Sequence, residues 1–333
     1  MRKLIRINIA VLIMAALFVG IAYLLPQTVH VERTAVIEAL PKTVYSQIID
    51  LKSWNKWSVW YQMDPEMEIT YSNYGVGVGA GYTWDSENKK VGTGSVKITD
   101  AVAFRSITVS LNFMKDSNAT STFLLSEVDG SIQITWFFKY NTGKNPIARW
   151  MGVFMDNFVG PDFEKGLQNL NALCKGLETN KAYIVLLDDV EEFAFASIRE
   201  KVQYIDISLK MEEMYEKIGN YLAQKEIEMA GMPYSLYHLM DEDGIDLECG
   251  IPTTSLLDGN DEIETGTFRK TRCAILDFYG DYQNLSDGHS AVQKWIENHG
   301  FTLAAPPIEI YESDPGTEPN SEKWLTRICY PVE

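Results

Sequence analysis

The fold of the C-terminal half is decided by two runs of sequence, Pro307-Ile-Glu-Ile-Tyr311 and Trp324-Leu-Thr-Arg-Ile-Cys-Tyr-Pro-Val332. Successive side chains of a strand point to opposite faces, so the two isoleucines of the first run share one face, and Glu309 and Tyr311 share the other. The polar loop between the runs contains Asp314-Pro315-Gly316, and this arrangement is typical of an antiparallel hairpin. The second run places four side chains on one face: Trp324, Thr326, Ile328 and Tyr330.

An earlier stretch of the chain repeats this pattern in degenerate form. Pro233-Tyr-Ser-Leu-Tyr237 matches the first run, and Cys249-Gly-Ile-Pro252 matches Ile328-Cys-Tyr-Pro331, with Ser235 in the place of Glu309. Each copy follows a helix-patterned segment and, before that, a strand-like segment. Internal repetition is a strong indicator of fold, and here it predicts two consecutive βαββ units.

The charge of the chain is unevenly distributed. The 333 residues leave room for two domains, and the formal net charge is −17. Residues 181–333 hold 12 basic and 30 acidic residues, whereas residues 27–180 hold 14 basic and 16 acidic residues. An acidic domain repels a phosphate backbone, and no basic helix-turn-helix pattern precedes it, so we expect no nucleic-acid partner. The field favours a cationic or neutral small-molecule ligand.

The first 26 residues have the pattern of a membrane anchor. Arg2, Lys3 and Arg6 precede an apolar run from Ile7 to Leu25 that ends at Pro26. About 20 apolar residues span a bilayer as a helix, and basic residues on the N-terminal side favour a cytoplasmic N-terminus with the soluble part outside the cytoplasm. A cleavable signal peptide is the alternative, although the apolar core of such peptides is usually shorter. We therefore predict a single-pass membrane protein.

Residues 27–178 show the pattern of an antiparallel sheet closed by a long helix. Turn residues separate the predicted strands, as in a meander. The predicted helix begins at Gly160-Pro161, with proline at its first position, and carries one apolar stripe at three- and four-residue spacing. The predicted strands are 28–37, 68–71, 80–86, 92–100, 106–113, 121–126 and 131–140, with a short helix over 42–50 after the first.

Several motifs in this segment resemble the START/polyketide-cyclase-like superfamily (SRPBCC, the helix-grip fold) in its membrane-anchored form. The resemblance implies an apolar ligand held between the sheet and the long helix. The motifs are Val31-Glu-Arg33, Ala39-Leu-Pro41, Val44-Tyr45, Asp50-Leu51, Gly77-Val-Gly-Ala80 with Tyr82 and Trp84, Asn88-Lys-Lys-Val-Gly92, and Gly160-Pro-Asp-Phe-Glu-Lys-Gly166.

Three tryptophans at spacing three, Trp54, Trp57 and Trp60, belong to the same resemblance. Large aromatic side chains usually serve burial, so the simpler interpretation is core packing at the mouth of the sheet. The functional interpretation is that one or more of them line the entrance of a cavity. The glycine-rich run 75–81 lacks the Lys-Ser/Thr and the following helix of a phosphate-binding loop, and we expect no cofactor.

After a linker over residues 179–183, residues 184–333 resemble the GyrI-like (gyrase-inhibitor-like) effector-binding domain. The motifs that carry this resemblance are Tyr279-Gly-Asp-Tyr-Gln-Asn-Leu285, Trp295-Ile-Glu-Asn-His-Gly300, Pro307–Tyr311 and Cys329-Tyr-Pro-Val332. The resemblance implies a glutamate at the base of an aromatic pocket between the repeats. By motif, that residue is Glu309, with Tyr311 beside it.

The chemistry of a carboxylate among aromatic rings fits an organic cation, because charge and ring quadrupole both attract it. Partial burial would also raise the pKa of the carboxyl group and prepare it for proton transfer. The alternative is a solvent-facing glutamate on an ordinary hairpin. We predict a ligand site at Glu309 and Tyr311, with four candidate wall residues: Tyr237, Tyr279, Trp324 and Tyr330.

The remaining reactive residues form no recognisable site. The four histidines lack metal-ligand spacing, and we expect no metal. Buried free thiols are the simpler interpretation of Cys174, Cys249, Cys273 and Cys329, although a bridge among the last three remains open.

Three functions remain open for the whole chain. The leading hypothesis is a non-enzymatic, membrane-anchored protein that senses, sequesters or transfers a small hydrophobic or cationic molecule. The second is a hydrolase of small electrophilic molecules, with Glu309 as general acid/base and Tyr311 or Tyr330 assisting. The third is a lipid-transfer protein centred on the START-like half.

Overall fold

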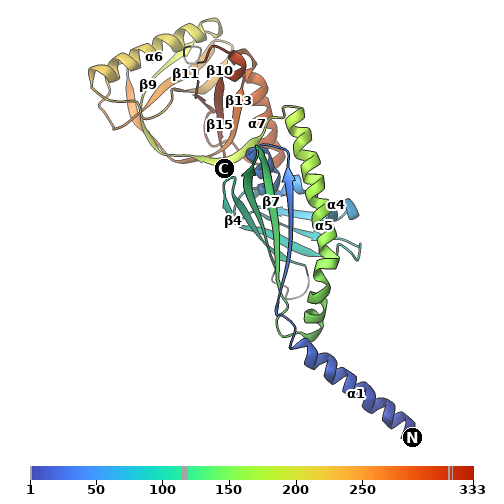
Figure 1. Ribbon diagram of the computed structural model, residues 1–333. Coiled ribbons are helices and arrows are strands. Elements are labelled where there is room, and N and C mark those ends of the chain that lie inside the picture. The colour runs from blue at the N-terminus through green and yellow to red at the C-terminus, as the bar shows by residue number, and fades with distance from the viewer. Residues whose placement is uncertain (1, 114–118, 314–315, 317) are drawn as a thin grey trace. The chain divides into compact units, whose positions relative to one another are not determined.

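The computed structural model describes residues 2–113, 119–313, 316 and 318–333 and divides into two compact units, one ending at Ala182 and one beginning at Tyr183 (Figure 1). Each unit is α+β, and the predicted sequence of an apolar helix, a helix-grip domain and two βαββ repeats is confirmed. Asp314 and Pro315 of the predicted hairpin loop lie outside the described residues.

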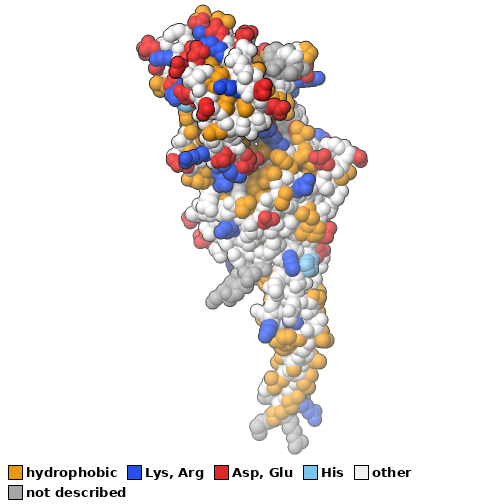
Figure 2. Space-filling view, turned by 90° about the vertical axis from the view of Figure 1, so that its left-hand side faces the viewer, with side chains coloured by type: hydrophobic (Ala, Val, Ile, Leu, Met, Phe, Trp, Pro, Cys, Tyr) orange, Lys and Arg blue, Asp and Glu red, His pale blue; other side chains and the backbone are white. Residues whose placement is uncertain are grey.

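The apolar run at the N-terminus forms a single helix, α1 (Arg2–Ala22). Its segment Ile5–Ala22 is long and apolar enough to cross a membrane, and only 6% of that segment is buried. Figure 2 shows hydrophobic side chains over the surface of this helix. Helix α1 is therefore a candidate membrane anchor.

The first unit is built on a seven-stranded antiparallel sheet in the order β1-β7-β6-β5-β4-β3-β2. Consecutive strands are neighbours except at β1, which pairs with β7 from Thr28↔Asn141 to Ile37↔Ile132. The strands are β1 (Thr28–Ile37), β2 (Glu68–Ser72), β3 (Gly81–Asp85), β4 (Gly94–Val102), β5 (Ser106–Asn112), β6 (Ala119–Val128) and β7 (Ser131–Asn141).

Short helices connect β1 to β2 and cover part of the core. Two tryptophans of the Trp54, Trp57 and Trp60 motif are held in place by hydrogen bonds in these helices. The indole N–H of Trp54 donates to the Ile48 carbonyl, and that of Trp57 donates to the Gln47 carbonyl. Satisfied indole N–H groups allow both rings to be buried. The helices are α2 (Pro41–Ile49), η1 (Leu51–Ser53), α3 (Trp54–Trp57) and α4 (Val59–Met63), and η2 (Asn73–Gly75) follows β2.

The long helix α5 (Pro146–Thr179) starts earlier than the sequence pattern predicts. The prediction that it begins at Gly160-Pro161 is wrong, because Pro161 lies inside the helix. The helix begins instead at a second proline, Pro146, after Asn145, whose side-chain oxygen accepts hydrogen bonds from the backbone N–H groups of Ile147 and Ala148. A capping asparagine followed by proline is a favourable helix start.

The second unit is an eight-stranded sheet in the order β12-β9-β11-β10-β14-β15-β13-β8. The repeats are β9-α6-β10-β11 and β13-α7-β14-β15, and their strands β10 and β14 meet at the centre. Each repeat is preceded by an edge strand that pairs with the other repeat: β8 pairs with β13, and β12 pairs with β9. The strands are β8 (Val185–Val190), β9 (Phe193–Val202), β10 (Tyr234–Asp241), β11 (Gly244–Thr253), β12 (Glu264–Phe268), β13 (Thr271–Tyr279), β14 (Ile308–Tyr311) and β15 (Leu325–Pro331).

One amphipathic helix belongs to each repeat: α6 (Ile207–Gln224) and α7 (Leu285–His299). Helix α7 ends at Gly300, whose φ of 79° is the left-handed conformation expected of a C-terminal glycine. Short 3-10 turns precede these helices and the last strand: η3 (Tyr204–Asp206), η4 (Tyr282–Asn284) and η5 (Ser321–Lys323).

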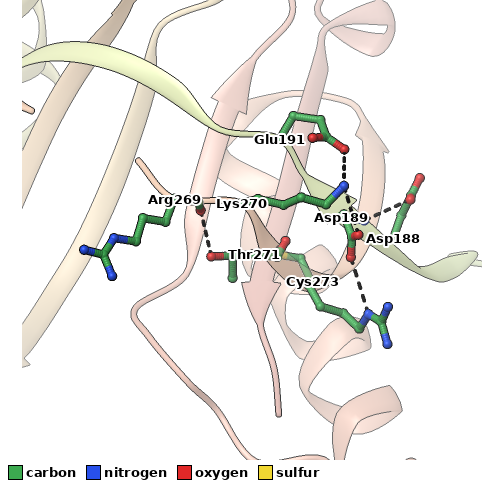
Figure 3. A network of polar contacts seen from close by, with 8 residues as sticks. Asp188, Asp189, Glu191, Arg269, Lys270, Thr271 and Cys273 are labelled. Atoms are coloured by element: carbon green, nitrogen blue, oxygen red, sulfur yellow. Dashed lines mark hydrogen bonds and ion pairs between the residues drawn. The ribbon is translucent and has the colours of Figure 1, made fainter. Parts of the chain in front are cut away.

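Ion pairs at the β8–β13 edge of this unit are exposed. Figure 3 shows Lys270 between two carboxylates; its Nζ lies 2.6 Å from Glu191 Oε1 and 3.3 Å from Asp189 Oδ2. Exposed pairs of this kind contribute about 0–1 kcal/mol to stability.

Candidate functional site

Glu309 lies at the centre of the second unit and is only 4% exposed. Strand β14 carries it between β10 and β15, opposite Ser235 on one side and Ile328 on the other. Ser235 is the residue that occupies its place in the first repeat. The carboxylate is thus brought to the junction of the two repeats, on strands that pair through their backbones.

Three side chains converge on this carboxylate. The hydroxyl groups of Tyr311 and Tyr237 lie 2.7 Å and 3.0 Å from Glu309 Oε2. The Nε2 atom of His289, on α7, lies 2.8 Å from Oε1. Because burial of an unpaired carboxylate costs several kcal/mol, this set of partners is what makes its position tolerable.

The network continues beyond His289. The side-chain amide of Gln293 donates to the Tyr330 hydroxyl oxygen over 3.2 Å, and the Tyr330 hydroxyl lies 2.9 Å from His289 Nδ1. The hydroxyl can donate to Nδ1 of a neutral imidazole or accept from Nδ1 of a protonated one. In both arrangements Gln293, Tyr330 and His289 form a continuous chain of polar contacts that ends at the Glu309 carboxylate.

The phenols around Glu309 are held in their neutral form. Burial raises the pKa of both Tyr237 and Tyr311 well above the ordinary value, and the charge of Glu309 raises each further. Burial likewise raises the pKa of Tyr330 to about 12. Because all three remain protonated at neutral pH, they stay available as hydrogen-bond donors.

A row of aromatic rings extends from Tyr311 to the surface of the unit. The ring of Tyr282 lies edge-on to Tyr311, with centroids 5.8 Å apart, and against Trp324, with centroids 4.9 Å apart. Both Tyr282 and Trp324 are half-buried. On the other side, Tyr215 of α6 meets Tyr311 edge-on at 6.5 Å.

The structure brings together most of the residues predicted from sequence. Tyr237, Tyr311 and Tyr330 belong to the hydrogen-bond network, and Trp324 belongs to the aromatic row. Tyr279 does not join them: its side chain is 63% exposed and follows the buried Phe278 at the end of β13. Neighbouring strand residues point to opposite faces, so Tyr279 points away from the face on which Phe278 meets α7.

Four site residues were missed from sequence: His289, Gln293, Tyr215 and Tyr282. The position of His289 on the buried face of α7 was available from the helical pattern, because it lies four residues after Leu285 and three before Val292. The partner of His289 could not be predicted in the same way, because Glu309 lies on a strand 20 residues further along the chain.

A glycine allows α7 to come close enough for this contact. A Cβ atom at Gly288 would lie 2.7 Å from Ile328 Cδ1 and 2.9 Å from a ring carbon of Phe278. These distances are shorter than packed side chains allow. The absence of a side chain at Gly288 therefore sets the distance between α7 and the sheet, and with it the reach of His289.

The first unit has a separate, apolar cavity of about 590 Å³ between its sheet and α5. Trp54 and Trp60 line it together with the buried Val109 and Trp136, whereas Trp57 is fully buried in the core. The exposed Lys89 and Lys90 lie at its edge. Core packing is thus confirmed for Trp54 and Trp57, and Trp54 and Trp60 line the cavity.

Among the residues that the structure describes, no three histidine, cysteine or carboxylate side chains form a group that could hold a metal ion. All four cysteines are free and buried, and burial raises the pKa of Cys249 to about 11, so that its thiol stays protonated.

Comparisons with known families agree with this architecture. Residues 28–175 match the polyketide cyclase / dehydrase and lipid transport family, and residues 187–333 match the GyrI-like small molecule binding domain. The chain therefore joins a polyketide-cyclase-like domain to a GyrI-like small-molecule-binding domain, after a candidate membrane anchor. No curated protein matches the chain.

Solved structures similar to part of the chain include three with TM-scores between 0.33 and 0.40. The EcmrR C-terminal domain is 21% identical, with 45% of this chain and 98% of that chain covered and a TM-score of 0.40. SAV2435 bound to tetraphenylphosphonium is 18% identical, with 45% and 93% covered and a TM-score of 0.33. A hydrolase from Listeria innocua is 13% identical, with 48% and 98% covered and a TM-score of 0.34.

Proposed function

We propose that the protein is a membrane-anchored, non-enzymatic binder of small molecules with two ligand sites, one for an organic cation and one for an apolar molecule. The observation that carries the proposal is the buried Glu309 carboxylate, surrounded by hydrogen-bonding groups and aromatic rings. Tyr237, Tyr311 and His289 lie within hydrogen-bond distance of it. A bound organic cation would pair with the negative charge of this carboxylate.

The aromatic side chains fit the same ligand class. Rings within about 6 Å of a cation attract it through their quadrupoles, and the attraction grows when the site excludes water. Tyr311, Tyr282 and Trp324 provide such rings from the carboxylate outward. Since Glu309 is 4% exposed, entry of the ligand requires that side chains of this row move aside.

The cavity of the first unit would take the apolar ligand. Its volume of about 590 Å³ falls in the range of small-molecule sites, and its walls are largely aromatic and aliphatic. The hydrophobic effect then supplies most of the affinity.

The proposed location follows from α1 and the charges before it. Arg2, Lys3 and Arg6 precede the apolar segment, and this charge distribution supports a cytoplasmic N-terminus. In that orientation both units would lie outside the cytoplasm. The predicted segments 1–26, 27–178, 179–183 and 184–333 remain our proposal for the domain boundaries.

The test compares the full chain, reconstituted in lipid nanodiscs, with its Glu309→Gln and Glu248→Gln variants. Glu248 is a matched control because it is also a poorly exposed β-strand carboxylate paired with a histidine, His238, at 2.7 Å. The probes are a cationic rhodamine ester and the corresponding zwitterionic rhodamine acid.

We expect saturable binding of the cationic dye to the wild type and to Glu248→Gln. Glu309→Gln should lose at least about tenfold in affinity, corresponding to 1.4 kcal/mol. The zwitterionic dye should bind weakly to all three proteins. Equal binding of the cation by Glu309→Gln and wild type would refute the site.

A hydrolase is the second candidate function, favoured by the ordered chain Gln293–Tyr330–His289–Glu309. Such a chain could pass a proton to or from the carboxylate during general acid/base catalysis. Mass spectrometry of electrophilic esters and epoxides after incubation separates the hypotheses, because a binder returns its ligand unchanged. Product formation that disappears in Glu309→Gln would replace the binding proposal with the enzymatic one.

A lipid-transfer role remains the third candidate. It would depend on the cavity of the first unit and not on Glu309. Transfer of a fluorescent lipid between vesicles that is unaffected by Glu309→Gln would favour it.

A further inference from the structure

The first half of α5 carries an exposed apolar stripe. Ile147, Met151, Phe154 and Phe158 are 62%, 41%, 49% and 65% exposed. Their spacing of four, three and four residues places them on one face of the helix. Large exposed apolar surfaces of this kind usually mark a contact with a membrane or a partner.

Contacts at the start of α5 fix this stripe beside the end of α1. The Trp150 ring stacks on Phe18 with centroids 5.3 Å apart, and its indole N–H donates to the Phe18 carbonyl over 3.1 Å. The Arg149 guanidinium donates to the carbonyls of Ala22 and Tyr23 at the end of α1, at 3.3 Å and 3.1 Å. The last turn of α1 and the first turns of α5 are therefore joined.

These contacts give the depth of the stripe relative to a membrane crossed by α1. The apolar segment Ile5–Ala22 has 18 residues, or about 27 Å of helix, close to the thickness of a bilayer core. Phe18 lies four residues, or about 6 Å, before its end. Trp150 then stands at the membrane–water boundary, where tryptophan is enriched.

No unpaired charge interrupts the stripe. The two charged residues of residues 146–159 are Arg149, engaged at the end of α1, and Asp156, whose Oδ1 lies 2.8 Å from Arg33 Nη1. Gly152 allows this half of the helix to pack closely against the sheet, because a Cβ atom there would lie 2.6 Å from Val29 Cγ2. The four residues of the stripe remain exposed.

We propose that residues 146–159 of α5 dock onto the lipid bilayer with this stripe, and that the cavity of the first unit opens toward the lipid. Met151 and Phe158 belong both to the stripe and to the cavity wall. An apolar ligand could then pass between bilayer and cavity without crossing water. This inference rests on the proposed anchoring by α1, which supplies the membrane.

The test places single cysteines along α5 of the full chain in proteoliposomes and labels them with an environment-sensitive fluorophore. The positions are Ile147→Cys, Phe154→Cys and Phe158→Cys, with the exposed Gln168→Cys on the same helix as the matched control. The four native cysteines are buried, so the unsubstituted chain gives the background of labelling. Quenchers are aqueous iodide and lipids with a nitroxide on the upper acyl chain.

We expect iodide quenching at positions 147 and 154 to be several-fold weaker than at position 168, with lipid quenching strongest at 147 and weakest at 158. This gradient follows from the distance of about 16 Å along the helix between residues 147 and 158. Iodide quenching at all three positions equal to that at 168 would overturn the docking proposal.

Alkaline carbonate extraction of the same vesicles separates this failure from that of the proposed anchor. Release of the chain into the supernatant would refute anchoring by α1, and with it the membrane part of the proposed function. Retention of the chain together with free access of iodide would refute only the docking of α5.

Discussion

The cavity of the first unit and the Glu309 cluster of the second are both buried, yet they are held together by different forces. The cavity is bounded by aromatic and aliphatic side chains that contact one another without directional requirements. The cluster depends on donors placed at 2.7–3.0 Å from one carboxylate. A site defined by shape tolerates substitution and selects ligands by size, whereas a site defined by hydrogen bonds to a charge fails when one partner is lost.

The largest effect should come from Glu309→Ala. Removal of the carboxylate leaves Tyr237, Tyr311 and His289 without their acceptor, so we expect the second unit to lose about 1–3 kcal/mol of unfolding free energy for each group left unsatisfied. Hydrogen exchange of the β10 and β14 amides during denaturant titration would measure it. Glu248→Ala, which removes the partner of a single histidine, should cost clearly less. Equal losses would show that Glu309 is no more tightly held than Glu248, a carboxylate on the inner strand β11.

The next effect concerns the glycine beneath α7. Gly288→Ala should reduce the unfolding free energy by about 1–3 kcal/mol through overpacking and should move His289 away from Glu309. The chemical shifts of the His289 imidazole would report the second change. Gly219→Ala in α6 is the control, because nothing lies within 4 Å of a Cβ atom there. That variant should be more stable by about 0.5–1 kcal/mol, since alanine favours helices over glycine. Destabilisation by Gly219→Ala of the same size would contradict our account of Gly288.

A smaller change in stability is expected in the cavity. Leu111→Trp adds volume to a space of about 590 Å³, so we expect the unfolding free energy to change by less than about 1.5 kcal/mol. Binding of an apolar fluorescent dye should nevertheless weaken markedly, because the added ring occupies the ligand volume. Val78→Trp, at a position 59% exposed, is the control and should leave dye binding unchanged. Unaltered dye binding by Leu111→Trp would place the apolar site elsewhere.

The smallest effect is the contribution of one buried phenol to the pH dependence of stability. Burial raises the pKa of Tyr330 from 10.0 to about 12, so its neutral form is favoured in the folded state. Its contribution to stability is complete below pH 10 and is lost as the pH rises toward about 12. The decline in melting temperature above pH 10 should be less steep in Tyr330→Phe than in the wild type. Parallel curves for the two proteins would contradict this assignment.

Much of the second unit could be predicted from the chain because its signals are local and occur twice. The alternation in Pro307–Tyr311 and in Pro233–Tyr237 fixed the strands, and Gly300 fixed the end of α7. The edge strands β8 and β12 were not predicted, because each pairs with the repeat to which it does not belong. Such crossed pairing depends on contacts distant in sequence.

The errors in the first unit have a similar origin. Pro146 and Pro161 each resemble a helix start, and most of the large apolar residues between them are exposed, although Met155 is buried. A prediction that assumes apolar residues to be buried therefore starts the helix at Pro161 and not at Pro146. The exposed stripe of Ile147, Met151, Phe154 and Phe158 is the reason for the error.

The pairing of Ser235 with Glu309 has a consequence for the orientation of a ligand. The two repeats form a near-symmetric frame in which Tyr237 and Tyr311 are equivalent residues, and both donate to the same oxygen of Glu309. A frame with a carboxylate in each repeat would accept a ligand in either of two opposite directions. With serine in one half, the frame is polarised, and a ligand with one charged end has a single favourable direction of entry.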